Sequence, residues 1–296
     1  MTEAVIDRLN AKKLELESRL SNLYHGGSQR REALEYKIKK IEELITAYQS
    51  VPLPINLEEA KEILKQQVGF SGLKKRSLLE KLAQRNFLAL CLFGPPGVGK
   101  STCAPFLARA LKREFFSINL GGLSDTSILL GTSENSLGTE TGQLAKALIA
   151  TKTHNPLILL DEIDKAGSSY KTAIHDCLLN VLDSAQNHEV LDHYLDVKLD
   201  FSRVIFVVTA NDLTKIPPPL RDRLLIVKLN GYNIEQKKEI AQKIIQDWFS
   251  RHEQFNQDNF EIDSEALETL INKTNEEGVR QLKMALDDIF DYCLFQ

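Results

Sequence analysis

The sequence predicts an α/β fold in which a parallel sheet is covered by helices on both faces, with an N-terminal helical hairpin and a C-terminal all-helical part. Three observations support this prediction. Five short apolar runs alternate with helical stretches between residues 57 and 230, two stripes at helical spacing precede them, and only helical spacing follows them. Near-continuous apolar strands that alternate with helices are typical of parallel sheets buried on both faces.

The first 50 residues predict an antiparallel coiled-coil hairpin, which we assign to residues 1–50. Residues 5 to 23 carry apolar residues on one helical face, and a break at Gly26 and Gly27 follows. A second stripe then steps by four and three residues, as in a coiled-coil seam. It comprises Leu34, Ile38, Ile41, Ile45 and Tyr48. Glutamates interleave the basic residues of these helices, which favours a solvated face over a nucleic-acid stripe. The segment VPLP that follows is interpreted as a stiff linker.

Residues 57–230 are predicted to contain the sheet. The candidate strands are the runs Phe87 to Phe93, Phe115 to Leu120, Leu157 to Leu160, Val204 to Thr209 and Leu224 to Leu229. Residues 231–296 show only helical spacing, so we expect a small helical domain there.

The composition is that of a globular protein. The 296 residues are 43% hydrophobic and 26% charged, enough for one large domain and a smaller one. A net charge of -4 gives no overall basic field, so we do not expect nucleic acid as a partner. The four cysteines are too widely spaced for a metal site, and no apolar run reaches membrane-spanning length. We expect a cytoplasmic protein without a membrane partner.

A glycine-rich loop follows the first strand. The segment GPPGVGKS matches G-x-x-x-x-G-K-[ST] between a strand and a helix. Backbone N–H groups of such a loop surround phosphate oxygens, the lysine reaches the β- and γ-phosphates, and the hydroxyl reaches Mg²⁺. We therefore expect ATP and Mg²⁺ as cofactors, with Ser101 as a metal ligand. The residues predicted to bind the nucleotide here are Gly94, Pro95, Pro96, Gly97, Val98, Gly99, Lys100, Ser101 and Thr102.

A proline lies inside the helix that this loop opens. Pro105 has no N–H for the helical ladder, and its ring clashes with the preceding turn. We predict a kink or a widened turn there.

Acidic and amide residues follow two later strands. LILLDEID ends the third strand, so Asp161 and Glu162 emerge at the carboxyl edge of the sheet, where ligands of open α/β sheets bind. We expect Asp161 to hold Mg²⁺ through water and Glu162 to orient and polarise the attacking water. VTAND ends the next strand and places Asn211 at the same edge, where its amide can hydrogen-bond the water or the γ-phosphate.

This combination resembles the AAA+ ATPases, and its details resemble the ATPase module of the Lon protease family. The resemblance covers roughly residues 57 to 293. It is carried by LLDEIDK at 159–165, QNHEVLDHYLDV at 186–197, TAND at 209–212, IPPPLRDR at 216–223, NGYNIEQKKEIA at 230–241 and EEGVRQLKMAL at 276–286. The resemblance implies a P-loop AAA+ large domain at 57–230, a helical lid at 231–296, and a homo-oligomeric, hexameric ring that hydrolyses ATP to ADP and phosphate.

The resemblance also implies roles for three further residues. Arg223 would be an arginine finger aimed at the γ-phosphate bound by the neighbouring subunit, and Arg221 would be an interface charge or a spare finger. Arg280 would reach from the lid to the bound nucleotide and couple the lid angle to the nucleotide state. Tyr232, at the lid hinge, would pack near the adenine, as would residues 68–73. Glu162, Asn211, Arg223 and Arg280 form the predicted catalytic set.

The sequence departs from the family in the loop that grips polypeptide. Family members carry an aromatic residue there, whereas residues 131–142, GTSENSLGTETG, place Ser136 at that position and Leu137 after it. An aromatic side chain grips by burying a large flat area at low entropy cost, and serine does not. A second segment that contacts polypeptide in family members reads SSYKTA here, at 168–173. Its Tyr170 either replaces the missing aromatic contact or is an ordinary surface tyrosine. Because the chain ends at Gln296, directly after the lid, we expect no Ser/Lys peptidase on it.

Two functions agree with these observations. The first is an ATP-dependent, ring-forming motor that remodels a protein client captured by the N-terminal hairpin, without protease activity. The intact Lys100, Asp161 and Glu162 favour it. The second is a nucleotide-gated binding or assembly module with little turnover, which the altered loop favours. A DNA-remodelling ATPase is a third possibility that salt-dependent DNA binding tests.

Overall fold

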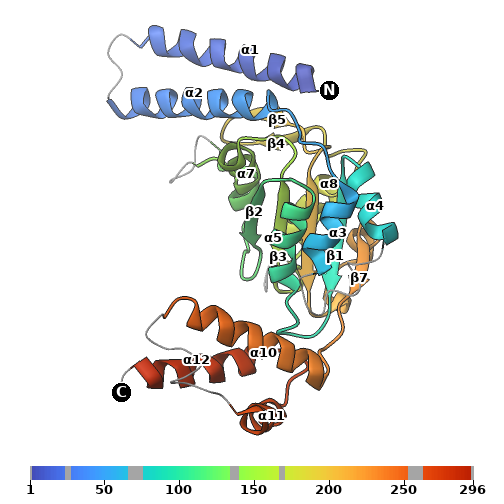
Figure 1. The fold of residues 1–296 in the computed structure, drawn as a ribbon. Helices are drawn as coiled ribbons and strands as arrows, with labels where there is room; N and C mark the ends of the chain where they lie inside the picture. Colours follow the sequence, from blue (N-terminus) through green and yellow to red (C-terminus); the bar gives the residue numbers. More distant parts are fainter. Residues whose placement is uncertain are drawn as a thin grey trace.

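The computed structural model describes residues 2–23, 28–65, 76–133, 140–166, 171–252 and 263–294. A parallel sheet occupies the middle of the molecule, a helical hairpin lies at one end, and three C-terminal helices lie at the opposite end (Figure 1). The predicted fold class is confirmed, since the sheet is parallel and carries helices on both faces. No described helix is both long and apolar enough to cross a membrane.

The strands of the main sheet follow the order β2-β3-β6-β1-β7, and every neighbouring pair is parallel. The insertion of β6 between β1 and β3 brings the carboxyl ends of all three strands to one place, where ligands of such sheets bind. All five predicted runs form strands, within one residue at each end. Their bounds are β1 (Leu88–Phe93), β2 (Phe115–Asn119), β3 (Leu157–Asp161), β6 (Ile205–Ala210) and β7 (Leu225–Lys228).

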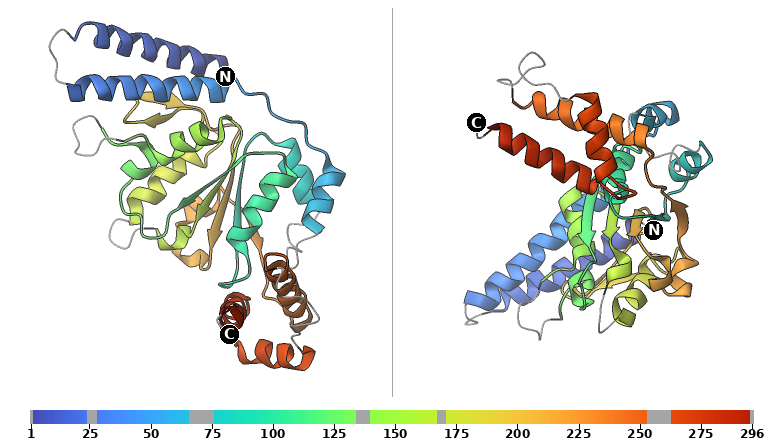
Figure 2. Two further views of the ribbon diagram at one scale, coloured as in Figure 1. Left: turned by 60° about the vertical axis from the view of Figure 1, so that its left-hand side comes forward. Right: turned by 90° about the horizontal axis from the view of Figure 1, so that it is seen from below.

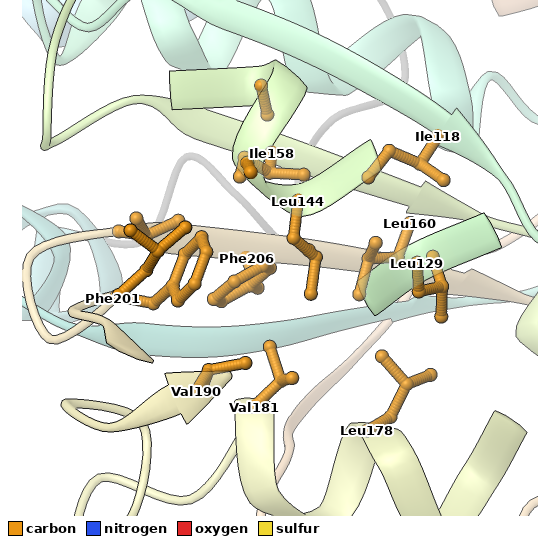
Figure 3. Close-up of a cluster of buried hydrophobic side chains, with 14 of the residues drawn as sticks. Ile118, Leu129, Leu144, Ile158, Leu160, Leu178, Val181, Val190, Phe201 and Phe206 are labelled. Atoms are coloured by element: carbon orange, nitrogen blue, oxygen red, sulfur yellow. The ribbon is translucent and has the colours of Figure 1, made fainter. Parts of the chain in front are cut away.

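Alternate residues of each central strand belong to two separate apolar cores. Leu88, Leu90 and Leu92 of β1 pack with α3 (Leu57–Lys65), α4 (Arg76–Gln84) and α5 (Lys100–Ala110). The intervening residues pack on the other face with α7 (Gln143–Thr151) and α8 (Lys171–Val181), together with the short α6 (Ser127–Leu130). Figure 3 shows this second core, with Phe206 and Phe201 between Leu144 and Val181. Burial of both faces explains why the strands are apolar at nearly every position.

A second, two-stranded antiparallel ribbon was not predicted. It consists of β4 (Val190–Asp192) and β5 (Val197–Leu199), and three residues are too few to show a strand alternation. The buried carboxylate of Asp192 organises the turn, because its Oδ1 accepts the N–H groups of Tyr194 at 3.1 Å and Leu195 at 2.9 Å. Its Oδ2 accepts the N–H of Gly142 at 2.9 Å. Burial raises the pKa of Asp192 in spite of these three bonds.

The N-terminal hairpin consists of α1 (Thr2–Ser21) and α2 (Ser28–Tyr48). Its apolar stripes belong to the same core as the sheet, so they face the body as well as each other. Ile38 and Ile45 of the predicted seam are only partly buried, whereas Leu44 is fully buried. Lys12 pairs with Asp196 at 2.9 Å, which joins the hairpin to the β4–β5 turn.

The last turn of α2 is fixed to the body by Tyr48 and His154. The Tyr48 hydroxyl donates to the Asp200 carbonyl at 2.9 Å and accepts the Asp200 N–H at 2.8 Å. The buried His154 ring stacks on Tyr48 with centroids 6.0 Å apart, and its Nδ1 lies 3.1 Å from Ser50 Oγ. Burial, followed by the nearby Arg203 guanidinium, lowers the pKa of His154 below 6.5.

Acidification is therefore expected to destabilise the fold through His154. As pH falls below 6.5 the unfolded chain binds a proton at this residue before the folded chain does, so the free energy of unfolding decreases. Urea unfolding at a series of pH values from 7 downward measures this slope. The variant His154→Gln should lose part of the slope, and an identical slope in both proteins would contradict the assignment.

The C-terminal part has its own apolar core. It contains α10 (Ile234–Phe249), α11 (Ser264–Lys273) and α12 (Arg280–Leu294), which Figure 2 shows from two further directions. Trp248 stacks on Phe290 with ring centroids 4.7 Å apart. A capping box between Asn233 and Gln236 starts α10 immediately after the sheet ends.

Candidate nucleotide-binding site

A cavity of about 540 Å³ lies at the carboxyl edge of the sheet, between the glycine-rich loop, the ends of β3 and β6, and the start of α12. From the loop and α5 it is lined by Pro96, Gly97, Gly99, Lys100, Ser101 and Thr102. Gly94, Pro95 and Val98 belong to the same loop and do not line the cavity. The remaining walls contain Asp161, Glu162, Asn211 and Arg280, so most of the predicted site residues are brought together here.

The loop has the backbone that a phosphate cradle requires. Gly97 has φ 78° and Gly99 has φ 80°, a left-handed conformation that other residues adopt only with strain. A Cβ atom on Gly97 would also lie 3.2 Å from Arg280. Gly99 directly precedes α5, so the free N–H groups of that helix start at the cavity.

Lys100 is buried and folds back onto its own loop. Its Nζ donates to the carbonyl oxygens of Gly94 at 2.8 Å and Pro95 at 2.7 Å. Burial lowers the pKa of its ammonium, an effect that the nearby carboxylates of Asp164 and Asp161 oppose. The Lys100 ammonium thus has neutral carbonyl oxygens as its described partners beside an open cavity. A phosphate that enters this cavity would stabilise its charge.

The helix that Lys100 begins contains Pro105. The α5 helix runs from Lys100 to Ala110 as one uninterrupted α-helix with Pro105 inside it, so the predicted widened turn is absent, and the kink stays a prediction. Pro105 is exposed, so its ring lies on the solvent side of the helix and disturbs no buried packing.

The carboxylate of Asp161 lies at the centre of a hydroxyl network. Its Oδ1 accepts the Ser101 hydroxyl at 2.7 Å and also the hydroxyl of Thr209. No group of three or more His, Cys, Asp or Glu side chains suited to a metal occurs among the described residues. Mg²⁺ needs only one or two protein oxygens when phosphates and water supply the others, so Ser101 and Asp161 fit a nucleotide-bound Mg²⁺.

Glu162 has a strained backbone at the edge of the cavity. Its φ is 59°, which is uncommon for a residue with a side chain and is typical of functional turns. Its N–H donates to Thr209 Oγ1 at 2.9 Å, and its Oε1 accepts the Lys165 ammonium at 2.5 Å. The carboxylate of Glu162 is thus held beside the cavity by the exposed side chain of Lys165.

Asp164 is a site residue that the sequence reasoning missed. Its Oδ2 accepts the N–H groups of Asn211 and Asp212, both at 3.1 Å, and so fixes the turn that carries the Asn211 side chain. Its Oδ1 is buried and has no hydrogen-bond partner within the described part of the chain. The run DEID contains this second aspartate after the predicted pair, but its bonds to the turn after β6 are visible only in the fold.

The C-terminal helices touch the glycine-rich loop directly. The Val279 N–H donates to the Gly97 carbonyl at 3.1 Å. A Cβ atom on Gly278 would lie 2.5 Å from the Pro96 carbonyl oxygen, so only glycine permits this approach. Arg280 lines the cavity as predicted, and Lys283, which was not predicted, lines it one turn further along α12.

Tyr232 supports the loop from behind. Its hydroxyl donates to the Val98 carbonyl at 2.8 Å, and its N–H donates to the Glu277 carbonyl at 2.9 Å. Burial raises the pKa of Tyr232 to about 12. It does not line the cavity, and residues 68–73, the other part of the predicted adenine contact, lie outside the described residues.

Arg223 lies away from the cavity of its own chain. Its Nε and Nη2 donate to Asp183 Oδ2 at 3.2 and 2.9 Å, and its Nη1 donates to the Pro219 carbonyl at 2.8 Å. Pro217 caps the single-turn helix α9 (Pro218–Arg221), and Pro218 and Pro219 begin it. Arg223 follows two residues after this helix ends. The guanidinium is therefore held side-on in one orientation.

The predicted polypeptide-gripping residues Ser136, Leu137 and Tyr170 lie outside the described residues. The two ends of the first segment are described. The Thr132 N–H donates to the Glu140 carbonyl at 3.1 Å, and Gly142 is bound to Asp192.

Comparison with known proteins agrees with this geometry. The family described as "ATPase family associated with various cellular activities (AAA)" matches residues 90–232. The chain is 38% identical over 248 residues to "Lon protease homolog, mitochondrial" of Drosophila melanogaster, covering 81% of this chain and 24% of that protein. It is 41% identical over 242 residues to "Lon protease" of Protochlamydia amoebophila, covering 79% and 29%. It is 40% identical over 243 residues to "Lon protease 2" of Myxococcus xanthus, covering 79% and 29%. The chain thus spans about a quarter of the length of these relatives.

Proposed function

Because the chain contains an AAA+ ATPase module of the Lon type, we propose that it is an ATP-hydrolysing motor that assembles into a homo-oligomeric, hexameric ring and remodels a protein partner. Peptide cleavage is not part of this proposal. The observation that carries the proposal is the single cavity at which the glycine-rich loop, Asp161, Glu162, Asn211 and Arg280 meet.

The residues of the cavity have distinct tasks in this proposal. Bound ATP supplies the phosphoryl group, and Mg²⁺ supplies charge neutralisation on the phosphates. With nucleotide and metal bound, Lys100 would exchange the carbonyls of Gly94 and Pro95 for phosphate oxygens, and Ser101 and Asp161 would hold the metal. Glu162 leaves Lys165 to orient a water molecule and accept its hydrogen bond. Asn211, fixed through its backbone by Asp164, donates its amide to the water or to a γ-phosphate oxygen.

Arg223, the predicted arginine finger, is proposed to act on the nucleotide bound by the neighbouring subunit. Arg223 cannot serve its own cavity in the observed arrangement, because Asp183 and Pro219 hold it elsewhere. Of the five guanidinium N–H groups, three are used by these bonds, which leaves two for a phosphate presented by another protomer. A ring in which each protomer completes the next one's site meets this requirement.

A concentration series of ATP turnover tests the proposal. The specific activity should rise with protein concentration and level off where sedimentation velocity shows full assembly, because a finger supplied in trans follows mass action. Phosphate release measures turnover, and the rate in EDTA added in excess over Mg²⁺ gives the background. Equal specific activity for monomer and assembly would contradict the ring mechanism.

A second candidate is a nucleotide-gated binding module with little turnover. The serine at position 136, where relatives of this type carry an aromatic, favours it. The same concentration series separates the two functions, since a binding module assembles with ATP and releases no phosphate. The N-terminal hairpin is the proposed partner-binding element in both, because only one side of it is used to pack against the body.

A further inference from the structure

A second cavity lies at the opposite, amino-terminal edge of the sheet. It has a volume of about 380 Å³ and lies between linker residues 52–57, the end of α4, and the loops that lead into β1, β2, β3 and β6. None of the residues predicted to bind nucleotide borders it. Its volume falls within the range of small-molecule sites, about 300–1,000 Å³.

This cavity carries positive charge without compensation. Arg85, Arg113 and Arg203 border it, and no aspartate or glutamate does so within the described ranges. The exposed Arg85 side chain makes no hydrogen bond or ion pair with a described residue. Among the described residues, the hydrogen-bond contact of the Arg203 side chain is to the His154 ring, with Nη1 3.3 Å from Nε2. Three arginines that border one cavity whose described lining contains no carboxylate give it a positive potential, which attracts anions.

Arg113 is the deepest of the three. Its Nη1 donates to the carbonyls of Asn155 at 2.9 Å and Arg203 at 2.6 Å, and its Nη2 makes only a long contact of 3.5 Å to Asn86. Its buried Nε has no hydrogen-bond partner among the described residues. Burial without a carboxylate lowers the pKa of Arg113 to about 10. Carbonyl oxygens fix the side chain in place, but they leave its charge unmatched.

We propose that this arginine cavity, defined by Arg85, Arg113 and Arg203, binds a small molecule through a phosphoryl or carboxylate group. Guanidinium groups bind both kinds of oxyanion in a bidentate manner. The amides of Asn86 and Asn155 also border the cavity and offer donors beside the arginines. The apolar side chains of the linker form the remaining wall, which suits an organic body attached to the anionic group. The site is separate from the proposed ATPase centre and does not depend on it.

Calorimetric titration of the full chain tests this inference. Pyrophosphate provides the phosphoryl probe and citrate the carboxylate probe, both at matched ionic strength. The titrations are made in a Lys100→Ala background so that the glycine-rich loop binds phosphate weakly. The double variant Arg85→Gln/Arg203→Gln should weaken binding at least about tenfold, because charge-assisted hydrogen bonds are lost. Both arginines are exposed, and thermal unfolding verifies that the variant folds.

A matched control removes the same charge elsewhere. The exposed Arg19 on α1 and Arg251 after α10 lie outside the cavity, and Arg19→Gln/Arg251→Gln should change the affinity by less than about twofold in 0.15 M salt. Binding of pyrophosphate alone assigns the site to phosphoryl groups, and binding of citrate alone assigns it to carboxylates. Absence of binding by both probes, or equal weakening in the two double variants, would overturn the inference.

Discussion

Replacement of Arg223 by alanine is expected to lower ATP turnover about 10³- to 10⁵-fold while ATP binding is retained, because an arginine finger neutralises charge that develops only in the transition state. The variant keeps every residue that lines the cavity of its own chain, and Arg223 lies outside that cavity. Phosphate release by the assembled protein measures turnover, and fluorescence titration with a labelled nucleotide measures binding.

Mixed assemblies distinguish a finger in trans from a residue that merely stabilises its own chain. An Arg223→Ala protomer retains Glu162, and a Glu162→Gln protomer retains Arg223, so mixing two inactive proteins should restore part of the activity. Asp183→Asn, which weakens the side-on clamp at 2.9 Å but keeps the guanidinium, should lower turnover less than Arg223→Ala. If the mixture remains as inactive as its components, the proposed assignment of Arg223 is wrong.

Replacement of Glu162 by glutamine is expected to lower turnover about 10²- to 10⁴-fold, because a neutral amide cannot accept the proton of the attacking water. ATP affinity should stay close to that of the unmodified chain, since the glycine-rich loop and Asp161 are untouched. Rapid-quench measurement of a single turnover isolates the chemical step from product release.

A matched control for this variant is Glu268→Gln, which makes the same chemical change in an exposed ion pair with Lys238 on the C-terminal helices. It should leave turnover unchanged. A large loss of ATP binding in Glu162→Gln, or an equal loss of turnover in Glu268→Gln, would contradict the proposed role of Glu162.

The sheet was predictable because each strand can be recognised from its own short segment of the sequence. Each strand is a short apolar run, and each run is apolar because both faces are buried, so the pattern is visible without knowledge of the partners. The β4–β5 ribbon was not predictable in the same way. It depends on the buried carboxylate of Asp192, which binds Gly142 from a distant part of the chain.

The candidate site likewise contains residues that the sequence predicts and residues that only the fold reveals. The loop, Asp161, Glu162 and Asn211 follow strands directly, so strand order alone brings them together. Asp164 and Lys283 were missed because their relevance appears only when β6 and α12 are placed against β3 and the loop. The placement of Tyr232 behind Val98, outside the cavity, likewise depends on how the last helices meet the loop.

The attachment of the N-terminal hairpin has a mechanical consequence. Besides its apolar packing against the body, it carries two separated polar attachments, Lys12 to Asp196 in the β4–β5 turn and Tyr48 to Asp200, just after β5. The same ribbon grips Gly142 through Asp192. A partner that pulled on the hairpin would therefore also pull on this ribbon and, through the bond between Asp192 and Gly142, on the segment that begins α7.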